Sequence, residues 1–448
     1  MRVPSPPPTF DDLFLELTKT EPNRVLELMR TPVFEPGDGY LHWDKLRHRP
    51  LPDGLTLEEW WFALKWKRRQ QYQELPLTDP EGLPFVFGLL GFVQRALHQV
   101  DQRCSGSIAM PEVVTADDHA RNHYLVNSLM EEAIRSSQLE GATTSRRVAK
   151  DLLRSGRKPK DRSERMILNN YRALQFMRDV GHELTMDTIL ELHRIVTDGT
   201  LDNPGAAGRF QTPEEDRVAI YDRNSDQLLH RPPPAEQLPA RVQALCDFAN
   251  ADGDSDPFVH PVIRAILIHF WLAYDHPFED GNGRTARALF YWYMRTRGYW
   301  LVEYLTVSRI LADAPAKYGR SFLYTETDER DTTYFIRYQL GVIERAVDEL
   351  YAYFDRKVQE MREVEGLMKA GSRQFNKRQL ALLGHAIRDP DREYTFHSHS
   401  ASHTVTHETA RNDLIPLAEM GLLERRRIGR QYLFTPHPEL AQRLKKAA

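Results

Sequence analysis

The chain has 448 residues and a formal net charge of −4, with 41% hydrophobic and 28% charged residues. This composition is ordinary for a globular protein, and the length favours two to four domains. So small a net charge argues against a chain that binds nucleic acid or membranes over its whole surface. The chain has two cysteines without metal-binding spacing, no signal peptide pattern and no apolar run long enough to span a bilayer. We therefore expect a soluble cytoplasmic protein with no disulfide framework and no membrane contact.

Residues 1–107 are predicted to form an N-terminal region of short helices and loops that follows a proline-rich start. Two aromatic segments, residues 40–43 and the stretch around Trp60 and Trp61, indicate a packing surface. Because large aromatic side chains are more often buried than exposed, we expect Trp60 and Trp61 to be core anchors.

Residues 108–356 have a predominantly helical pattern with one exception. Two short segments, 217–221 and 227–229, flank a polar turn and predict a β-hairpin that contains Val218 and Ile220. A lone hairpin is not stable in water, so it must pack on the helices. The predicted fold class is thus mainly α, with one small hairpin.

Residues 276–287 read HPFEDGNGRTAR and lie between predicted helices over 261–274 and 282–297. Free backbone N–H groups and the positive end of the helix dipole meet at such a helix start, which suits a phosphate. Gly281 and Gly283 let the backbone approach a phosphate oxygen closely.

Four side chains of the same segment have complementary chemistry. Asp280 offers carboxylate oxygen to Mg²⁺, and Arg284 and Arg287, three positions apart on one helix face, can reach a polyphosphate. His276 titrates near neutrality and can remove a hydroxyl proton. Each residue alone has a commoner structural role, but together they predict a nucleoside triphosphate site.

This segment resembles the signature of the Fic family, HPFx(D/E)GNGRxxR, at every defined position. The resemblance implies a helical Fic fold that transfers AMP from ATP to a protein hydroxyl and releases pyrophosphate. It implies that His276 is the general base acting on a Ser, Thr or Tyr. It also implies that Asp280 binds the Mg²⁺ (or Mn²⁺) that bridges the α- and β-phosphates.

The resemblance further assigns the nucleotide contacts. Asn282 and nearby amides would hold the transferring phosphate, Arg284 and Arg287 would bind the β- and γ-phosphates, and Phe278 would anchor the loop. Gly283 stands where the kinase-like Doc branch has lysine, which favours AMP transfer over phosphorylation. The complete implied nucleotide-binding set is Glu140, Phe278, Asp280, Gly281, Asn282, Gly283, Arg284, Thr285, Arg287 and Tyr318.

A second motif, SSQLEG at residues 136–141, ends a helix predicted over about 117–140. It resembles the family's inhibitory signature, (S/T)xxxE(G/N), with Ser136, Glu140 and Gly141 matching. Glu140 alone would pass for a solvated helix-end carboxylate, but beside two arginines it is a candidate partner for Arg287. The resemblance therefore implies the class with an N-terminal inhibitory helix, and leaves open whether the same glutamate supports removal of AMP.

The resemblance also implies the partners. A flap beside the family's active site aligns a target segment by strand addition, which makes Val218 and Ile220 candidate target-binding residues. The expected partners are ATP, a target protein with a hydroxyl side chain (the chain itself included) and a second copy in a homodimer. Because the motif reads phosphates and not the base, transfer of UMP or phosphocholine stays open.

Residues 357–373 predict a helical linker, and residues 374–448 a basic winged helix-turn-helix domain. From Gly371 to the end there are 13 Lys and Arg against 8 Asp and Glu. The candidate DNA contacts are Arg411, Arg425, Arg427 and Arg430. Because winged helices also dock proteins, both uses stay open. The rival function is thus a DNA-binding regulator whose Fic domain only senses a nucleotide.

Overall fold

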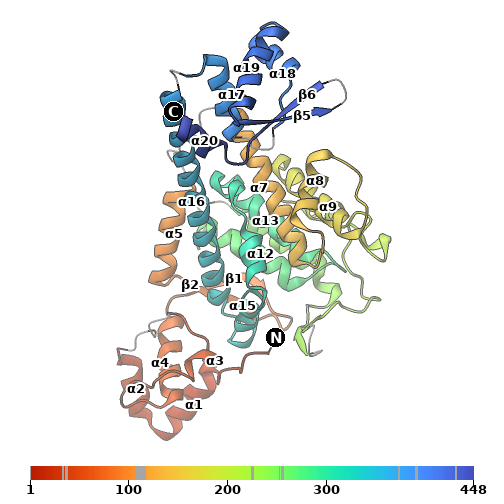
Figure 1. The fold of residues 1–448 in the computed structure, drawn as a ribbon. Coiled ribbons are helices and arrows are strands. Elements are labelled where there is room, and N and C mark those ends of the chain that lie inside the picture. The colour runs from red at the N-terminus through yellow and green to blue at the C-terminus, as the bar shows by residue number, and fades with distance from the viewer. Residues whose placement is uncertain are drawn as a thin grey trace. The chain divides into compact units, whose positions relative to one another are not determined.

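The computed structural model describes residues 2–32, 35, 39–105, 118–222, 227–251, 253, 257–371, 374–388, 392–428 and 431–447. The chain divides into two compact units, both drawn in Figure 1. The described residues up to 350 form the first unit, and those from 351 onward form the second. As the sequence predicts, the described residues are mainly helical, and their strands form three antiparallel pairs.

The first unit begins with four helices, α1 (Phe10–Thr20), α2 (Pro22–Arg30), α3 (Trp43–Leu46) and α4 (Leu57–Arg69). Thr56 and Glu59 form a reciprocal capping box at the start of α4, which satisfies two of its free backbone N–H groups. Trp60 and Trp61 are 4% and 0% exposed, so the prediction that they are core anchors is confirmed.

Two strands that the sequence analysis did not predict follow α4. They are β1 (Tyr72–Thr78) and β2 (Pro84–Gly88), and they pair antiparallel before α5 (Gly91–Cys104). Leu75 and Leu77 are buried and alternate with exposed positions, but Pro76 interrupts the strand pattern in the sequence. The free cysteines, Cys104 at the end of α5 and Cys246, are both buried.

The other α-helices and strands of the first unit are α7 (Asp118–Leu139), α8 (Arg146–Ser155), α9 (Arg162–Asp179), α10 (Met186–Thr197), β3 (Ile220–Tyr221), β4 (Leu228–His230), α11 (Leu238–Asn250), α12 (Pro261–Asp275), α13 (Asn282–Thr296), α14 (Val307–Asp313), α15 (Pro315–Thr327) and α16 (Thr333–Gly371).

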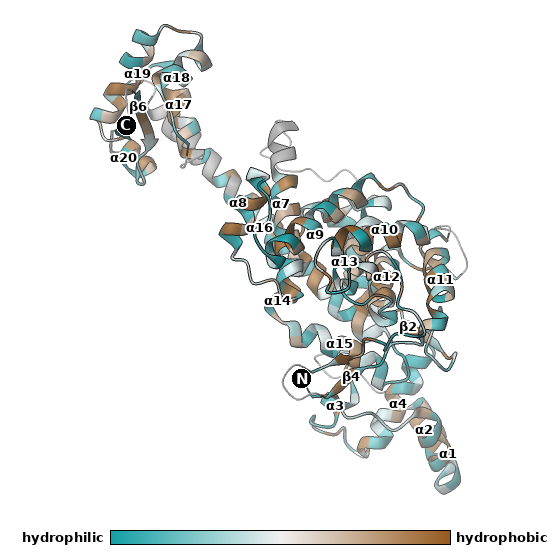
Figure 2. Ribbon diagram, turned by 90° about the vertical axis from the view of Figure 1, so that its right-hand side faces the viewer, coloured by the Kyte–Doolittle hydropathy of each residue, from teal (hydrophilic) through white to brown (hydrophobic). Residues whose placement is uncertain are grey.

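All residues of α12 are buried except Pro261 and Ala273. A helix buried on every side is the centre of a helical core, and hydrophobic residues gather on it in Figure 2. The short loop after α12 is thereby held on the most rigid part of the unit.

A buried charged network ties the N-terminal helices to the loop before α16. The ammonium of Lys65 lies 2.8 Å from Asp328 and 3.0 Å from Glu329, and the side chains of Lys65 and Asp328 are inaccessible to solvent. Arg68 donates to the hydroxyl of Tyr334 at 2.9 Å. Burial would lower the pKa of Lys65, but the neighbouring carboxylates outweigh it and raise that pKa. The N-terminal helices thus have a hydrophobic cluster of their own, and this network joins them to the rest of the first unit.

The second unit contains the rest of α16, which continues as a helix to Gly371 through most of the predicted linker. Its other elements are α17 (Lys377–Arg388), α18 (Phe396–His403), α19 (His407–Glu419), β5 (Leu423–Ile428), β6 (Gln431–Pro436) and α20 (Leu440–Ala447). Thr406 caps the start of α19, and β5 pairs with β6. The sequence analysis missed α18, because only Phe396 and His399 of this helix are buried and no apolar period marks it.

Among the described residues, no helix combines the length and the apolar character needed to cross a membrane.

Candidate nucleotide site

The loop between α12 and α13 is held in a defined shape by its own residues. His276 takes a left-handed backbone conformation with φ 45°, and Gly281 takes φ 86° at the N-cap of α13. The side chain of Asn282 accepts from the N–H of Phe278 at 3.0 Å and donates to its carbonyl at 2.8 Å. This reciprocal pair closes the loop at the start of α13, where free N–H groups favour an anion.

Beneath the loop, Phe278 is fully buried and stacks on His193 with ring centroids 3.7 Å apart. The N–H of Gly208 donates to His193 Nδ1, so Nε2 carries the proton and donates to the carbonyl of Asp280 at 2.8 Å. Burial lowers the pKa of His193 to about 4, which keeps the ring neutral. This support could not be predicted from the sequence, because His193 has no motif around it.

A buried ion pair fixes the residue before His276. Arg241 lies 2.6 Å from Asp275, whose carboxylate also accepts from Trp271 Nε1. Arg217, just before β3, donates to the carbonyls of Asp275 at 2.8 Å and His276 at 3.2 Å. Arg241 thus holds the side chain of Asp275, and Arg217 holds the backbone carbonyls of Asp275 and His276.

His276 is only partly exposed, and a contact with the end of α12 orients its ring. Nδ1 lies 3.3 Å from the carbonyl of Ala273, so Nδ1 carries the proton and Nε2 keeps its lone pair. Burial, followed by the nearby charge of His230, lowers the pKa of His276 to about 4. A neutral imidazole with a free Nε2 can accept a proton at physiological pH.

His230, on β4, is a second histidine at this site and was not found from the sequence. Its Nδ1 lies 2.7 Å from the carboxylate of Glu326, and its Nε2 lies 2.7 Å from the carbonyl of Tyr274. Two acceptors require two N–H groups, so the ring is an imidazolium. Burial would lower its pKa, but the hydrogen bond and charge of Glu326 outweigh it and raise that pKa. The partners lie 44 and 96 positions away, so no local pattern could reveal them.

The structure brings the end of α7 onto the second motif arginine. Arg287 donates from Nε to the hydroxyl of Ser136 at 2.9 Å, and from Nη2 to the carboxylate of Glu140 at 2.7 Å. Its side chain is 3% exposed. A Cβ built on Gly283 would collide with the Glu140 carboxylate, so this contact needs glycine there.

Arg284 turns away from Arg287, although the two share a helix face in the sequence pattern. It is fully buried, and Nη1 donates to the carbonyl of Val196 at 3.2 Å. Nη2 lies 3.2 Å from Asp280 but outside hydrogen-bond geometry, and neither Nε nor Nη2 has a hydrogen-bond partner among the described residues. Buried donors without acceptors are costly, and at this helix start they suit the oxygens of a phosphate.

Asp280 is the predicted metal ligand, and its side chain is 39% exposed. Its carboxylate also lies 3.9 Å from Arg162. Within the described ranges, no cluster of three His, Cys, Asp or Glu residues could hold a metal ion. A single accessible carboxylate fits a Mg²⁺ ion that takes its other ligands from phosphate and water.

A cavity of about 200 Å³ opens beside His276, bounded by Glu140 after α7, the end of α12, β3, β4, α13 and α15. The hydroxyl of Tyr318 contacts His269 Nε2 at 2.8 Å on one wall. The predicted site residues that line the cavity are Glu140, Ile220, His276, Gly283, Arg287 and Tyr318. Those that lie outside its lining are Ser136, Gly141, Val218, Phe278, Asp280, Gly281, Asn282, Arg284 and Thr285. The hydroxyl of Thr285 donates to the carbonyl of Gly281, inside the first turn of α13.

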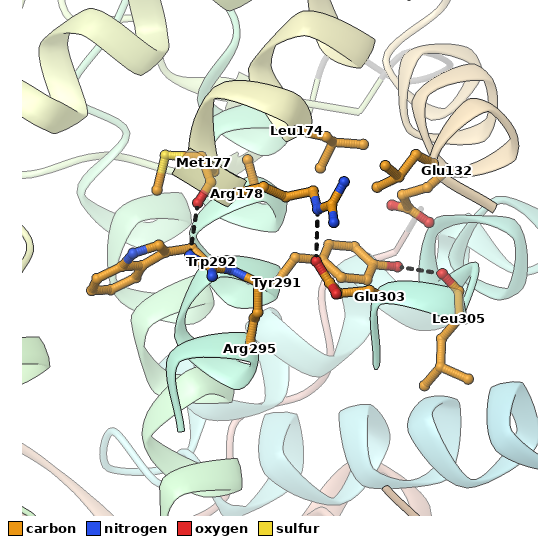
Figure 3. A pocket seen from close by; sticks show the side chains of 11 residues that line it. Glu132, Leu174, Met177, Arg178, Tyr291, Trp292, Arg295, Glu303 and Leu305 are labelled. Carbon is orange, nitrogen blue, oxygen red and sulfur yellow. Dashed lines mark hydrogen bonds and ion pairs between the residues drawn. The ribbon is translucent and has the colours of Figure 1, made fainter. Parts of the chain in front are cut away.

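Figure 3 shows a different, much smaller cavity of about 20 Å³ between α7, α9 and α13. Arg178 and Glu303 form an ion pair of 2.9 Å at its edge, and Tyr291 donates to the carbonyl of Leu305. A space of this size holds about one water molecule, so it is a packing gap and not a ligand site.

Comparison with known proteins shows which family the segment containing this loop and its helices resembles. Residues 183–294 match the model of the Fic/DOC family. A protein adenylyltransferase Fic of Nematostella vectensis is 37% identical over 110 residues, which are 24% of this chain and 22% of the relative. The protein adenylyltransferase Fic of Drosophila willistoni is 38% identical over 117 residues, 26% of this chain and 21% of the relative.

A solved Fic family protein from Desulfovibrio desulfuricans G20 shares the fold, with a TM-score of 0.51 and 20% sequence identity. The similarity covers 77% of this chain and 94% of that one. The chain is thus built on a Fic-like helical fold, and it contains a Fic domain. It spans about a fifth of the length of the curated relatives that it matches.

Proposed function

We propose that the chain is a protein adenylyltransferase that moves AMP from ATP to a Ser, Thr or Tyr hydroxyl of a protein, itself included. The observation that carries this proposal is the pairing of a neutral His276, whose Nδ1 faces the carbonyl of Ala273, with Arg284, whose Nε and Nη2 have no hydrogen-bond acceptor among the described residues. Both lie in the segment that matches the Fic/DOC model, and the curated relatives are named adenylyltransferases.

In this reaction, Nε2 of His276 takes the hydroxyl proton as the hydroxyl oxygen attacks the α-phosphorus of ATP. The bond between the α-phosphorus and the bridging oxygen breaks, and pyrophosphate leaves. The N–H groups at the start of α13 and the guanidinium of Arg284 stabilise the charge that develops on phosphate oxygens. A Mg²⁺ or Mn²⁺ ion held by Asp280 would neutralise the pyrophosphate as it departs.

We propose that β3 receives the target segment. Ile220 and Tyr221 are 36% and 56% exposed, and within the described ranges β3 pairs only with β4. A strand with a free edge can bind an extended peptide by main-chain hydrogen bonds. Ile220 also lines the cavity beside His276, so a segment added there would lie close to the base.

The contact between Glu140 and Arg287 supports an autoinhibited resting state. Because Glu140 and Ser136 accept from Nη2 and Nε of Arg287, this edge of the guanidinium is not available to a γ-phosphate. ATP would then bind without its terminal clamp and with its α-phosphate misplaced. Incubating AMP-modified protein with and without Glu140 tests whether this residue also supports removal of AMP.

The test is incubation of the Glu140→Gly protein with α-labelled ATP and Mg²⁺. We expect strong self-labelling that His276→Ala abolishes, and mass spectrometry should find an added AMP on a hydroxyl side chain. Absence of label from α-labelled ATP, with or without candidate targets, would overturn the proposal. UTP, GTP and CDP-choline in parallel identify the donor.

A second proposal concerns the second unit, as a winged helix-turn-helix that binds DNA. Arg411 on α19 and Arg425 and Arg427 on β5 are all exposed, as phosphate contacts must be. Arg430 lies outside the described residues. A mobility shift that weakens with salt, and that Arg425→Ala with Arg427→Ala abolishes, is the expected result. A shift that survives these changes would contradict it.

A further inference from the structure

Helix α15 is a wall between two cavities of the first unit. Tyr318, Phe322 and Glu326 line the cavity beside His276. Arg320 and Tyr324, on the same helix, line a second cavity of about 730 Å³. Positions 318, 322 and 326 repeat at four residues, and 317, 320, 321 and 324 at three and four, so the two sets occupy opposite helix faces.

The second cavity, which we call the α15 groove, is lined by cations without any carboxylate. Its six basic side chains are Lys45, Arg49, Lys317, Arg320, Arg337 and Arg345. This is unusual for its surroundings, because residues 1–370 contain 47 Lys and Arg against 56 Asp and Glu. Like charges brought together repel one another, and an anionic ligand relieves that repulsion.

Some of these cations are engaged and others are available. Arg345 lies 3.5 Å from Asp313, and Arg337 donates to the carbonyl of Tyr40 at 3.0 Å. Within the described part of the chain, Lys317 and Arg320 have no acidic partner at salt-bridge distance. Two available charges therefore lie on α15 itself, on the face opposite the candidate nucleotide site.

The aromatic rings of the groove are packed on one another. Tyr324 stacks on His42 with centroids 4.5 Å apart, and Tyr40 packs on Tyr334 at 5.0 Å. A site for single-stranded nucleic acid needs open aromatic faces on which bases can stack. These engaged rings leave charge as the means of recognition, which favours an acidic polypeptide.

We propose that the α15 groove docks an acidic segment of the protein that presents its hydroxyl to His276. The groove and the candidate active site are one helix apart, about 10 Å, so one target protein can engage both. This assignment of the occupant rests on the proposed transferase function. Docking by charge raises the local concentration of the target without reading the sequence around the acceptor.

The test is fluorescence anisotropy of a labelled ten-residue oligoglutamate peptide with the full chain at low salt and without ATP. Lys317→Glu combined with Arg320→Glu should raise the Kd at least tenfold. Arg95→Glu, which changes an exposed arginine on α5, should leave it within twofold, and Arg320→Lys should retain binding.

Equal affinity of the charge-reversed and wild-type proteins would overturn the proposal. So would tighter binding of a ten-residue oligothymidylate that is lost in the same variants, because the groove would then be a nucleic-acid site. Since peptide binding is measured without nucleotide, failure of AMP transfer does not alter this result. Conversely, if the wild-type protein binds no peptide while the Glu140→Gly protein still labels itself, the docking site is contradicted and the transferase function is not.

Discussion

Arg287 and Glu140 lie 147 positions apart in the chain and form an ion pair of 2.7 Å at the side of the candidate nucleotide site. The same guanidinium donates to the hydroxyl and the carbonyl of Ser136. Burial would lower the pKa of Arg287, but the charge of Glu140 outweighs it and raises that pKa. Under the proposed function, a triphosphate would reach this arginine only after Glu140 and Ser136 release it.

Replacing Glu140 by alanine should tighten ATP binding about tenfold, which corresponds to about 1.4 kcal/mol. The reason is that Arg287 becomes free to bind the terminal phosphate. Isothermal titration calorimetry with ATP and Mg²⁺ measures the Kd. Glu131→Ala is the control, because Glu131 is also on α7 but pairs with Arg146 and Lys150. If both variants bind ATP like the wild type, Glu140 does not restrict the site.

Replacing His230 by glutamine should move the acid limb of the labelling rate to higher pH. The imidazolium of His230 is one cause of the low pKa of His276, together with burial and Arg217. Without that charge, His276 takes up a proton more readily and loses its function as a base at a higher pH. The rate of self-labelling is followed from pH 4.5 to 8 in the Glu140→Ala background.

The control for this measurement is His98→Gln, because His98 is exposed on α5. Glu326→Gln should shift the limb in the same direction, since it removes the carboxylate that keeps His230 charged. A uniform drop in rate with an unchanged pH profile would show that His230 acts only by holding β4 in place.

Replacing Lys65 by methionine should destabilise the first unit by about 3–5 kcal/mol, because it leaves the buried carboxylate of Asp328 without its cation. Urea unfolding followed by tryptophan fluorescence measures the loss. Arg178→Met breaks an exposed pair with Glu303 and should cost about 1 kcal/mol or less. Equal effects of the two changes would mean that the buried network adds nothing.

Mild acid should weaken the first unit through three of its buried histidines. Burial lowers the pKa of His42 and His193 to about 4 and of His269 to about 3, so all three are neutral when folded. The unfolded chain binds protons at these residues below about pH 6.5. Their contribution is thus fully present above pH 6.5 and falls as the pH drops toward 4, by about 1.4 kcal/mol per pH unit for each histidine.

His230 acts in the opposite sense, because its pKa is raised in the folded state. Its contribution is complete below its ordinary pKa and is lost as the pH rises through the raised value. Urea midpoints at pH 7.5 and 5.0 compare the two effects, and three histidines should outweigh one. A midpoint that does not fall at pH 5.0 contradicts this prediction.

The sequence located α12, the loop and α13 almost to the residue, because an apolar helix, two glycines and a dense motif leave few alternatives. It missed β1, β2 and α18, where a proline or a polar composition hides the local period. The contacts that support the loop could not be predicted at all. Pairs such as His230 with Glu326, or Lys65 with Asp328, join segments 96 and 263 positions apart, and no feature of either segment indicates its partner.

The two cysteines have a practical consequence. Both are buried, and burial raises the pKa of each thiol to about 12, so neither forms a thiolate at neutral pH. Since the chain has only these two, a cysteine introduced at the exposed Tyr221 would be the one reactive thiol of the folded protein. A maleimide dye or spin label placed there would report the approach of a target strand without any prior removal of native residues.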